Sequence, residues 1–298
     1  MSRPDDIRKS VSEAYSLAVL QTQAPAASSC CAAPSPPESM LASLAGYSRE
    51  ALASLPADAV ASSFGCGNPV VLAEIREGDR VLDLGSGAGI DILLAAKLVG
   101  PKGKVIGVDM TPAMIERARS NAAAAGLGNV EVREGIIEEL PVEAGSVDLV
   151  LSNCVINLSP EKKRVFSEIH RVLRAGGRFS ISDIVAEPMP AWITEVSALY
   201  SACISGAIPE AEYLAGLANA GLVDVAVRDR LTYDRDQLSG LLGIEEGGSC
   251  CCGSAGGGQG GGGSTGCGPV GLPRTAALRM AKELAGKVSS VRITGRKP

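Results

Sequence analysis

Short apolar runs alternate with segments of helical length along the central part of the chain. Five runs rich in Val, Ile and Leu have the length of buried strands, at 80–84, 104–109, 129–133, 147–152 and 178–185. Segments typical of capped helices lie between them, at 90–99, 112–126 and 159–173. Strands that alternate with helices at this spacing predict βαβ units and a parallel sheet.

The segments on either side are less regular. Residues 1–62 form a leader that is too polar and broken to build a core of its own, so we expect it to pack over another part of the protein. Its helical stretches lie near 7–20 and 48–55. Beyond residue 188 the pattern predicts helices at 192–200, 210–219 and 275–284, and strands at 223–227 and 290–294. The sequence leaves open whether these two strands complete the main sheet or belong to a separate region.

The predicted fold class is α/β, with a doubly wound, Rossmann-like sheet and a smaller C-terminal α+β region for substrate. We divide the chain into the leader at 1–62, the sheet domain at 63–188 and the C-terminal region at 189–298. The last of these contains an insert rich in Cys and Gly at 247–268. Such an insert buries too little apolar surface to order itself, so we expect it to move unless a ligand gathers its thiols.

The composition excludes several classes of function. Of the 298 residues, 46% are hydrophobic and 20% are charged, as in soluble globular proteins. The net charge of −5, without a basic run, argues against a nucleic-acid partner. The single histidine, His170, excludes mechanisms and metal sites that need two imidazoles.

The N-terminal segment and the cysteine content bear on location. No apolar run approaches the roughly 18 residues of a spanning helix, and the first residues lack the net positive charge of a signal peptide. We therefore expect a cytoplasmic protein without a membrane partner, and we separately expect a monomer. In that compartment nine cysteines indicate reactive or ligand thiols rather than a disulfide framework.

A glycine-rich turn follows the first predicted strand, in the sequence Asp83-Leu84-Gly85-Ser86-Gly87-Ala88-Gly89. The glycines allow a sharp turn and a close approach of a ligand to the next helix. The spacing is G-x-G-x-G instead of the G-x-G-x-x-G of dinucleotide-binding proteins. It resembles the first motif of S-adenosylmethionine (SAM) dependent methyltransferases, whose ligand carries two cationic groups that suit an aspartate nearby.

The ends of the other strands extend this predicted cofactor site. Asp109 ends the second strand, where a carboxylate accepts ribose hydroxyls, and Asn153 ends the fourth. Met110 either contacts the adenine or packs in the core. The predicted cofactor-binding residues are Asp83, Gly85, Ser86, Gly87, Asp109, Met110, Gly135, Ile136 and Asn153.

Three cysteines occupy separate places around the predicted sheet. Cys154 directly follows the fourth strand, at the edge where doubly wound sheets bind ligands. Cys66 lies between two glycines ahead of the sheet, and Cys203 lies in the C-terminal region. Taken singly, Cys66 and Cys203 are as well explained by packing, because Cys is commonly buried. Together the three thiols indicate convergence on one soft ion, and trivalent arsenic suits a trigonal thiolate site.

These residues carry a resemblance to the arsenite SAM methyltransferases of microbial type. It runs from about residue 11 to 227 and returns at the final strand. Its most specific stretches are 65–69, 81–91, 107–112, 153–158, 181–185 and 203–207. The resemblance implies a class I methyltransferase fold, SAM as cofactor, and Cys66, Cys154 and Cys203 as the ligands of As(III).

The same resemblance implies a redox cycle. A further N-terminal cysteine takes part in that family, and Cys30 or Cys31 stands at about the right distance ahead of Cys66. The substrate would be arsenite or its thiol conjugates, and glutathione or thioredoxin would serve as the thiol reductant. The expected function is arsenite methylation in arsenic detoxification.

The insert departs from the family pattern. Four cysteines flank its glycines: Cys250, Cys251, Cys252 and Cys267. One interpretation is an arm that captures arsenite or a metal ion, because Cys tracts bind metals. The other is a tolerated loop insertion with incidental cysteines.

Two alternative functions stay open at this stage. One is a SAM methyltransferase for another small-molecule acceptor, against which stand the three placed cysteines and the few aromatic residues. The other is a protein that sequesters metalloids without turnover, against which stands the intact glycine turn with its aspartates. His170 and the charged residues at 161–164 are predicted to lie away from the site, the latter as a solvated face.

Overall fold

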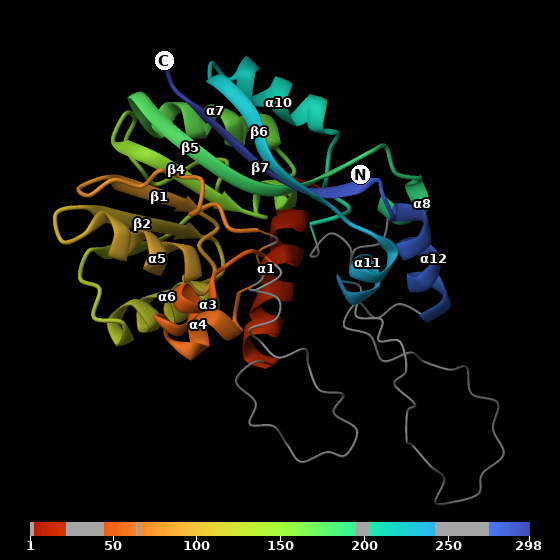
Figure 1. Ribbon diagram of the computed structural model, residues 1–298, viewed down its shortest axis with the longest axis horizontal. Helices are drawn as coiled ribbons and strands as arrows, with labels where there is room; N and C mark the ends of the chain where they lie inside the picture. Colours follow the sequence, from red (N-terminus) through yellow and green to blue (C-terminus); the bar gives the residue numbers. More distant parts are fainter. Residues whose placement is uncertain (1–2, 22–44, 64, 66, 195–202, 242–273) are drawn as a thin grey trace, which may run out of the picture.

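The computed structural model describes residues 3–21, 45–63, 65, 67–194, 203–241 and 274–298. Within them the strands form a seven-stranded sheet in the order β3-β2-β1-β4-β5-β7-β6 (Figure 1). The strands are β1 (Arg80–Leu84), β2 (Lys104–Asp109), β3 (Val130–Glu134), β4 (Val147–Asn153), β5 (Leu173–Ala186), β6 (Val223–Thr232) and β7 (Val288–Arg296). The first five are parallel, and β7 is antiparallel to β5 and β6. The predicted doubly wound α/β fold is confirmed, and the last two strands complete the main sheet.

Helices cover both faces of the sheet. On one side lie α5 (Ile90–Val99) and α6 (Pro112–Ala124), and on the other lie α7 (Lys162–Val172) and α10 (Glu210–Asn219) (Figure 1). Successive strand residues point to opposite faces, so Val81 joins the core beneath α5 while Leu82 joins the core beneath α7. Because both faces are covered, the central strands β1, β2 and β4 are largely apolar and buried rather than alternating.

The leader and the C-terminal region meet beyond the carboxyl ends of β4 and β5. The leader contributes α1 (Pro4–Gln21), α3 (Arg49–Ala53) and α4 (Ala57–Ala61), and the C-terminal region contributes α8 (Ala191–Thr194), α11 (Arg235–Leu241) and α12 (Arg274–Leu284). Helix α1 packs along α6 (Figure 1). A third apolar cluster joins Val11 of α1 to Cys154, Cys203 and residues of α12. This cluster places the leader beside two of the candidate thiols.

Several element boundaries differ from the predicted ones. Helix α7 begins at Lys162, after Glu161 as N-cap, rather than at the Ser-Pro pair. Strand β5 begins at Leu173 because the pairing with β4 shifts between Val147 and Leu149 and accommodates the extra residues. The predicted helix at 192–200 is present as α8, and its remainder lies outside the described residues. Among the described helices none combines the length and the apolar character needed to cross a membrane.

Candidate active site

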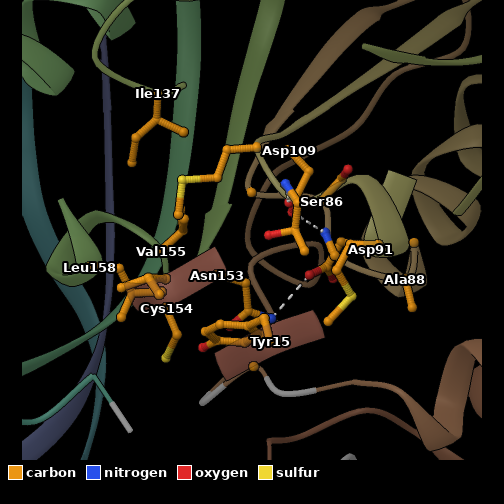
Figure 2. Close-up of a pocket in the computed structure, with 18 of the residues that line it drawn as sticks. Tyr15, Ser86, Ala88, Asp91, Asp109, Ile137, Asn153, Cys154, Val155 and Leu158 are labelled. Atoms are coloured by element: carbon orange, nitrogen blue, oxygen red, sulfur yellow. Dashed lines mark hydrogen bonds between the residues drawn. The ribbon is translucent and has the colours of Figure 1, made fainter. Parts of the chain in front are cut away.

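A pocket opens at the carboxyl ends of β1, β2 and β4, and α1 forms part of its wall (Figure 2). This is the edge at which doubly wound sheets bind ligands. Eight of the predicted cofactor-binding residues line it: Gly85, Ser86, Gly87, Asp109, Met110, Gly135, Ile136 and Asn153. The ninth, Asp83, is buried on β1 just before the glycine turn. The fold therefore gathers residues from four separate strand ends.

The glycine turn requires its glycines for two different reasons. Gly85 and Gly87 both have left-handed backbone, with φ of +64° and +53°. A Cβ on Gly85 would lie 2.7 Å from Cβ of Val155, so the turn packs tightly there. A Cβ on Gly87 would meet no protein atom within 4 Å, and Gly87 lines the pocket. Gly85 thus serves packing, whereas Gly87 keeps space open.

Asp109 is fixed by two backbone amides. The N–H of Gly87 donates to its Oδ2 at 2.9 Å, and the N–H of Thr111 donates to its Oδ1 at 2.8 Å. The side chain of Thr111 and the backbone of Met110 also hydrogen-bond to this carboxylate. Asp109 lines the pocket in this orientation, which suits a pair of ribose hydroxyls.

Three aspartates place their carboxyl groups in or beside the pocket. Asp83 and Asp91 are buried. Burial raises the pKa of all three carboxyl groups, and it raises that of Asp91 to about 6. Among the described residues none of the three forms a salt bridge, and Asp83 Oδ1 and Ser86 Oγ have no hydrogen-bond partner. A ligand with an ammonium and a sulfonium would supply the missing positive charge, so these residues fit SAM.

Asn153 connects this charged region to the loop ahead of the sheet. Its Nδ2 lies 2.7 Å from the carbonyl of Gly67, 3.0 Å from the Asp91 carboxylate and 3.0 Å from the Tyr47 hydroxyl. The Tyr47 hydroxyl in turn donates to Asp91 at 2.7 Å. Sequence reasoning placed Asn153 beside the cofactor and missed Tyr47 and Asp91, which follows the turn by two residues on α5.

Two of the three predicted arsenic ligands lie together, and one of them, Cys154, lines the pocket. Cys203 Sγ donates to the backbone carbonyl of Cys154 at 2.7 Å, and Cys154 N–H donates to the carbonyl of Ser182 at 2.8 Å. Both cysteines have left-handed backbone, with φ of +58° and +60°, a conformation that costs a non-glycine residue about 1–2 kcal/mol. Such strain persists where the surroundings impose it, and it is common at functional sites. Cys154 is disulfide-bonded, whereas Cys203 is a free thiol.

Burial and charge keep Cys203 protonated. Burial raises the pKa of its thiol well above the usual range, and the carboxylate of Asp183 raises it further, while Lys162 and a hydrogen bond from Tyr15 act in the opposite direction. The prediction that Lys162 belongs to a solvated face is wrong. Its Nζ turns inward to the carbonyls of Asn157 and Ser159, at 3.1 and 3.0 Å, and burial lowers its pKa.

The remaining candidate thiols lie outside the described residues. They are Cys30, Cys31, Cys66, Cys250, Cys251, Cys252 and Cys267. For Cys66 the described neighbour Gly67 is bound to Asn153, the residue immediately before Cys154.

Sequence reasoning missed the contribution of α1. Arg8, Val11 and Tyr15 of this helix line the pocket. Arg8 pairs with Glu138 and Glu161, and Glu138 also accepts a hydrogen bond from Ser159 at 2.6 Å. The signal was present, since Ile7, Val11 and Tyr15 recur every four residues and mark one face of a helix.

Comparison with known proteins decides the family. The chain matches a methyltransferase domain family over residues 75–233. It is 34% identical to an arsenic(III) S-adenosylmethionine methyltransferase of known structure from Chlamydomonas reinhardtii, covering 83% of this chain and 72% of that one with a TM-score of 0.62. The chain belongs to the arsenite methyltransferase family.

Curated arsenite methyltransferases agree with this assignment. The chain is 48% identical to that of Halobacterium salinarum over 63% of its own length, and 33% identical to that of Mus musculus over 80%. The matched region spans 48% and 64% of the length of those two relatives. A geranyl diphosphate methyltransferase, at 20% identity and a TM-score of 0.55, shares the fold alone.

Proposed function

We propose that this chain methylates trivalent arsenic, with SAM as the methyl donor and Cys66, Cys154 and Cys203 as the arsenic ligands. The observation that carries the proposal is the position of Cys154 and Cys203, in mutual contact where Cys154 lines a pocket that Asp91 and Asp109 also line. The names of the relatives support the same activity.

The pocket residues divide the binding of the donor among themselves. SAM, when bound, supplies a methyl group on a positively charged sulfur. Asp109 is oriented to accept ribose hydroxyls, and Gly87 leaves room for the chain of the ligand. Burial raises the pKa of Asp83 and of Asp91, and a cationic donor bound nearby would favour their ionised forms. Met110, Gly135 and Ile136 line the wall expected to hold the adenine.

The thiols present the arsenic to the donor. Three thiols displace three hydroxides of arsenite as water, so three S–As bonds form, three As–O bonds break, and no base is consumed. A protonated Cys203 suits this exchange, because its proton leaves with the hydroxide. The arsenic lone pair then attacks the methyl group in line. Holding two reactants in this way is worth about 7–11 kcal/mol in favourable cases.

The cycle also needs electrons. Methyl transfer raises arsenic formally to As(V), and its return to As(III) takes two electrons, which two thiols provide when they form a disulfide. We assign the redox thiol to Cys30 or Cys31, and the reducing equivalents to glutathione or thioredoxin in the cytoplasm. The disulfide at Cys154 is in keeping with this assignment, because reduction has to precede arsenite binding there. We assign arsenite capture to Cys250, Cys251, Cys252 and Cys267 of the insert, in a monomeric protein.

The test is turnover of the purified chain with arsenite, SAM and reduced glutathione, with arsenic species separated over time. Methylated arsenic is expected from the wild type and not from Cys154→Ser or Cys203→Ser, while both variants still bind SAM in calorimetry. Product formation by Cys154→Ser at the wild-type rate would contradict the assigned ligands. Tight arsenite binding without product would instead indicate sequestration, and SAM binding without arsenite binding would indicate another acceptor.

A further inference from the structure

The leader helix α1 places one side chain at the junction of the donor pocket and the thiols. Tyr15 lines the pocket, and its ring lies below Asn153 with the hydroxyl directed toward the side of Cys154 (Figure 2). The hydroxyl is hydrogen-bonded to Cys203, and burial together with nearby negative charge raises the pKa of Tyr15 well above its usual range. Tyr15 therefore remains protonated and acts as a donor.

The Cys203 sulfur takes part in two hydrogen bonds of opposite sense. It donates its proton to the carbonyl of Cys154 at 2.7 Å, and it accepts from the Tyr15 hydroxyl. Once the thiol has exchanged its proton for a bond to arsenic, the first of these bonds is lost because the donor is gone. The hydrogen bond from Tyr15 needs only a lone pair on sulfur, so it persists in the loaded state.

Both ends of α1 are fastened, which holds Tyr15 in place between them. Toward the start of the helix Arg8 pairs with Glu138 at 3.2 Å and with Glu161. Toward its end Arg117 of α6 donates to the carbonyl of Val19 at 2.8 Å. The buried side chain of Val11 adds an apolar anchor one turn before Tyr15. These contacts fix the backbone that carries Tyr15, and so they restrict where its hydroxyl can lie.

We propose that Tyr15 is a positioning residue for arsenic methylation, whose hydroxyl holds the Cys203 sulfur toward the donor pocket when arsenic is bound. The inference rests on the proposed function and extends it, because it makes the leader helix a working part of the arsenic site. Donation to the sulfur leaves the atom and electron balance of the exchange unchanged.

The test compares Tyr15→Phe with Tyr233→Phe. Tyr233 belongs to the same apolar cluster as Cys203, but its hydroxyl is hydrogen-bonded to Ser290. Both variants remove one buried hydroxyl and keep the ring, so Tyr233→Phe controls for packing. Trp192 is the single tryptophan of the chain and packs against this cluster, so its fluorescence reports arsenite binding to the reduced protein.

Tyr15→Phe is expected to weaken arsenite binding about tenfold, the equivalent of about 1.4 kcal/mol, and to lower kcat for methylation. SAM affinity and the midpoint of urea unfolding should stay close to those of Tyr233→Phe. Iodoacetamide should also modify Cys203 of the reduced apoprotein more slowly in Tyr15→Phe, because loss of a donor to the sulfur leaves less thiolate, as followed by peptide mass spectrometry. The inference would be overturned if Tyr15→Phe and Tyr233→Phe had the same arsenite affinity and the same alkylation rate. It would also be overturned if Tyr15→Phe lost SAM affinity and stability to the same extent as it lost arsenite affinity.

The two proposals fail separately. Absence of methylated arsenic in the wild type refutes the proposed function. In that case a slower alkylation of Cys203 in Tyr15→Phe still supports the contact between Tyr15 and the thiol, and an unchanged rate refutes it.

Discussion

Gly85 and Gly87 offer two positions at which the same added methyl group meets different surroundings. Both lie in the turn between β1 and α5 with φ between +53° and +64°. Substitution by alanine therefore imposes a similar backbone cost at each. Only at Gly85 does the new Cβ overlap a neighbour, the side chain of Val155.

The magnitudes follow from these contacts. A left-handed alanine costs about 1–2 kcal/mol, of which about 0.4–1 kcal/mol is offset because alanine restricts the unfolded chain. Gly87→Ala should therefore lower the free energy of unfolding by about 1 kcal/mol. Overpacking against Val155 adds about 1–3 kcal/mol, so Gly85→Ala should lower it by about 2–4 kcal/mol.

Urea unfolding of the reduced apoprotein, followed by circular dichroism, measures both values. The double variant Gly85→Ala/Val155→Ala should recover part of the loss, with a coupling energy of about 0.5–3 kcal/mol. Calorimetry should show the complementary effect, since Gly87→Ala fills open pocket space and should weaken SAM binding about tenfold, or about 1.4 kcal/mol. Equal destabilisation by the two single variants, or no recovery in the double variant, would refute this account of the turn.

Two further predictions concern charge at the pocket. Burial raises the pKa of Asp91 to about 6 from an ordinary 3.8, so the folded chain holds more protons than the unfolded chain between these values, and Asp91 lowers stability as pH rises through this window. The unfolding free energy of Asp91→Asn relative to wild type should therefore rise by roughly 1–3 kcal/mol between pH 4 and pH 7 in urea titrations, and a constant difference would show that Asp91 does not carry the effect. Arg8→Ala should release the start of α1 from Glu138 and Glu161. Amide hydrogen exchange in α1 should then accelerate, and SAM should bind about fivefold more weakly, a loss of about 1 kcal/mol. Lys9→Ala, at a mostly exposed position of the same helix, is the control and should change neither the exchange rate nor the SAM affinity.

The chain sequence determined the central sheet and the donor end of the site. Strands β1, β2 and β4 are apolar runs of strand length, and such runs have to be covered on both faces wherever they occur. The turn after β1 needs glycine at fixed positions because its backbone is left-handed there, and the spacing of these glycines can be recognised in the sequence alone. Asp109 follows from its position at a strand end, since parallel strands bring their carboxyl ends to one edge.

Tertiary structure alone decided how the remaining parts meet. Cys154 and Cys203 are 49 residues apart, and the sequence around each of them does not indicate that the Cys203 sulfur contacts the Cys154 carbonyl. The charged neighbours of Lys162 predict that it is exposed to solvent. In the folded chain its side chain instead donates to the carbonyls of Asn157 and Ser159. The sequence shows the buried face of α1 as an apolar stripe, but it does not show which part of the protein this face packs against. Periodicity tells which side of an element is buried, whereas the surface that buries it depends on contacts between distant segments, which only the folded chain brings together.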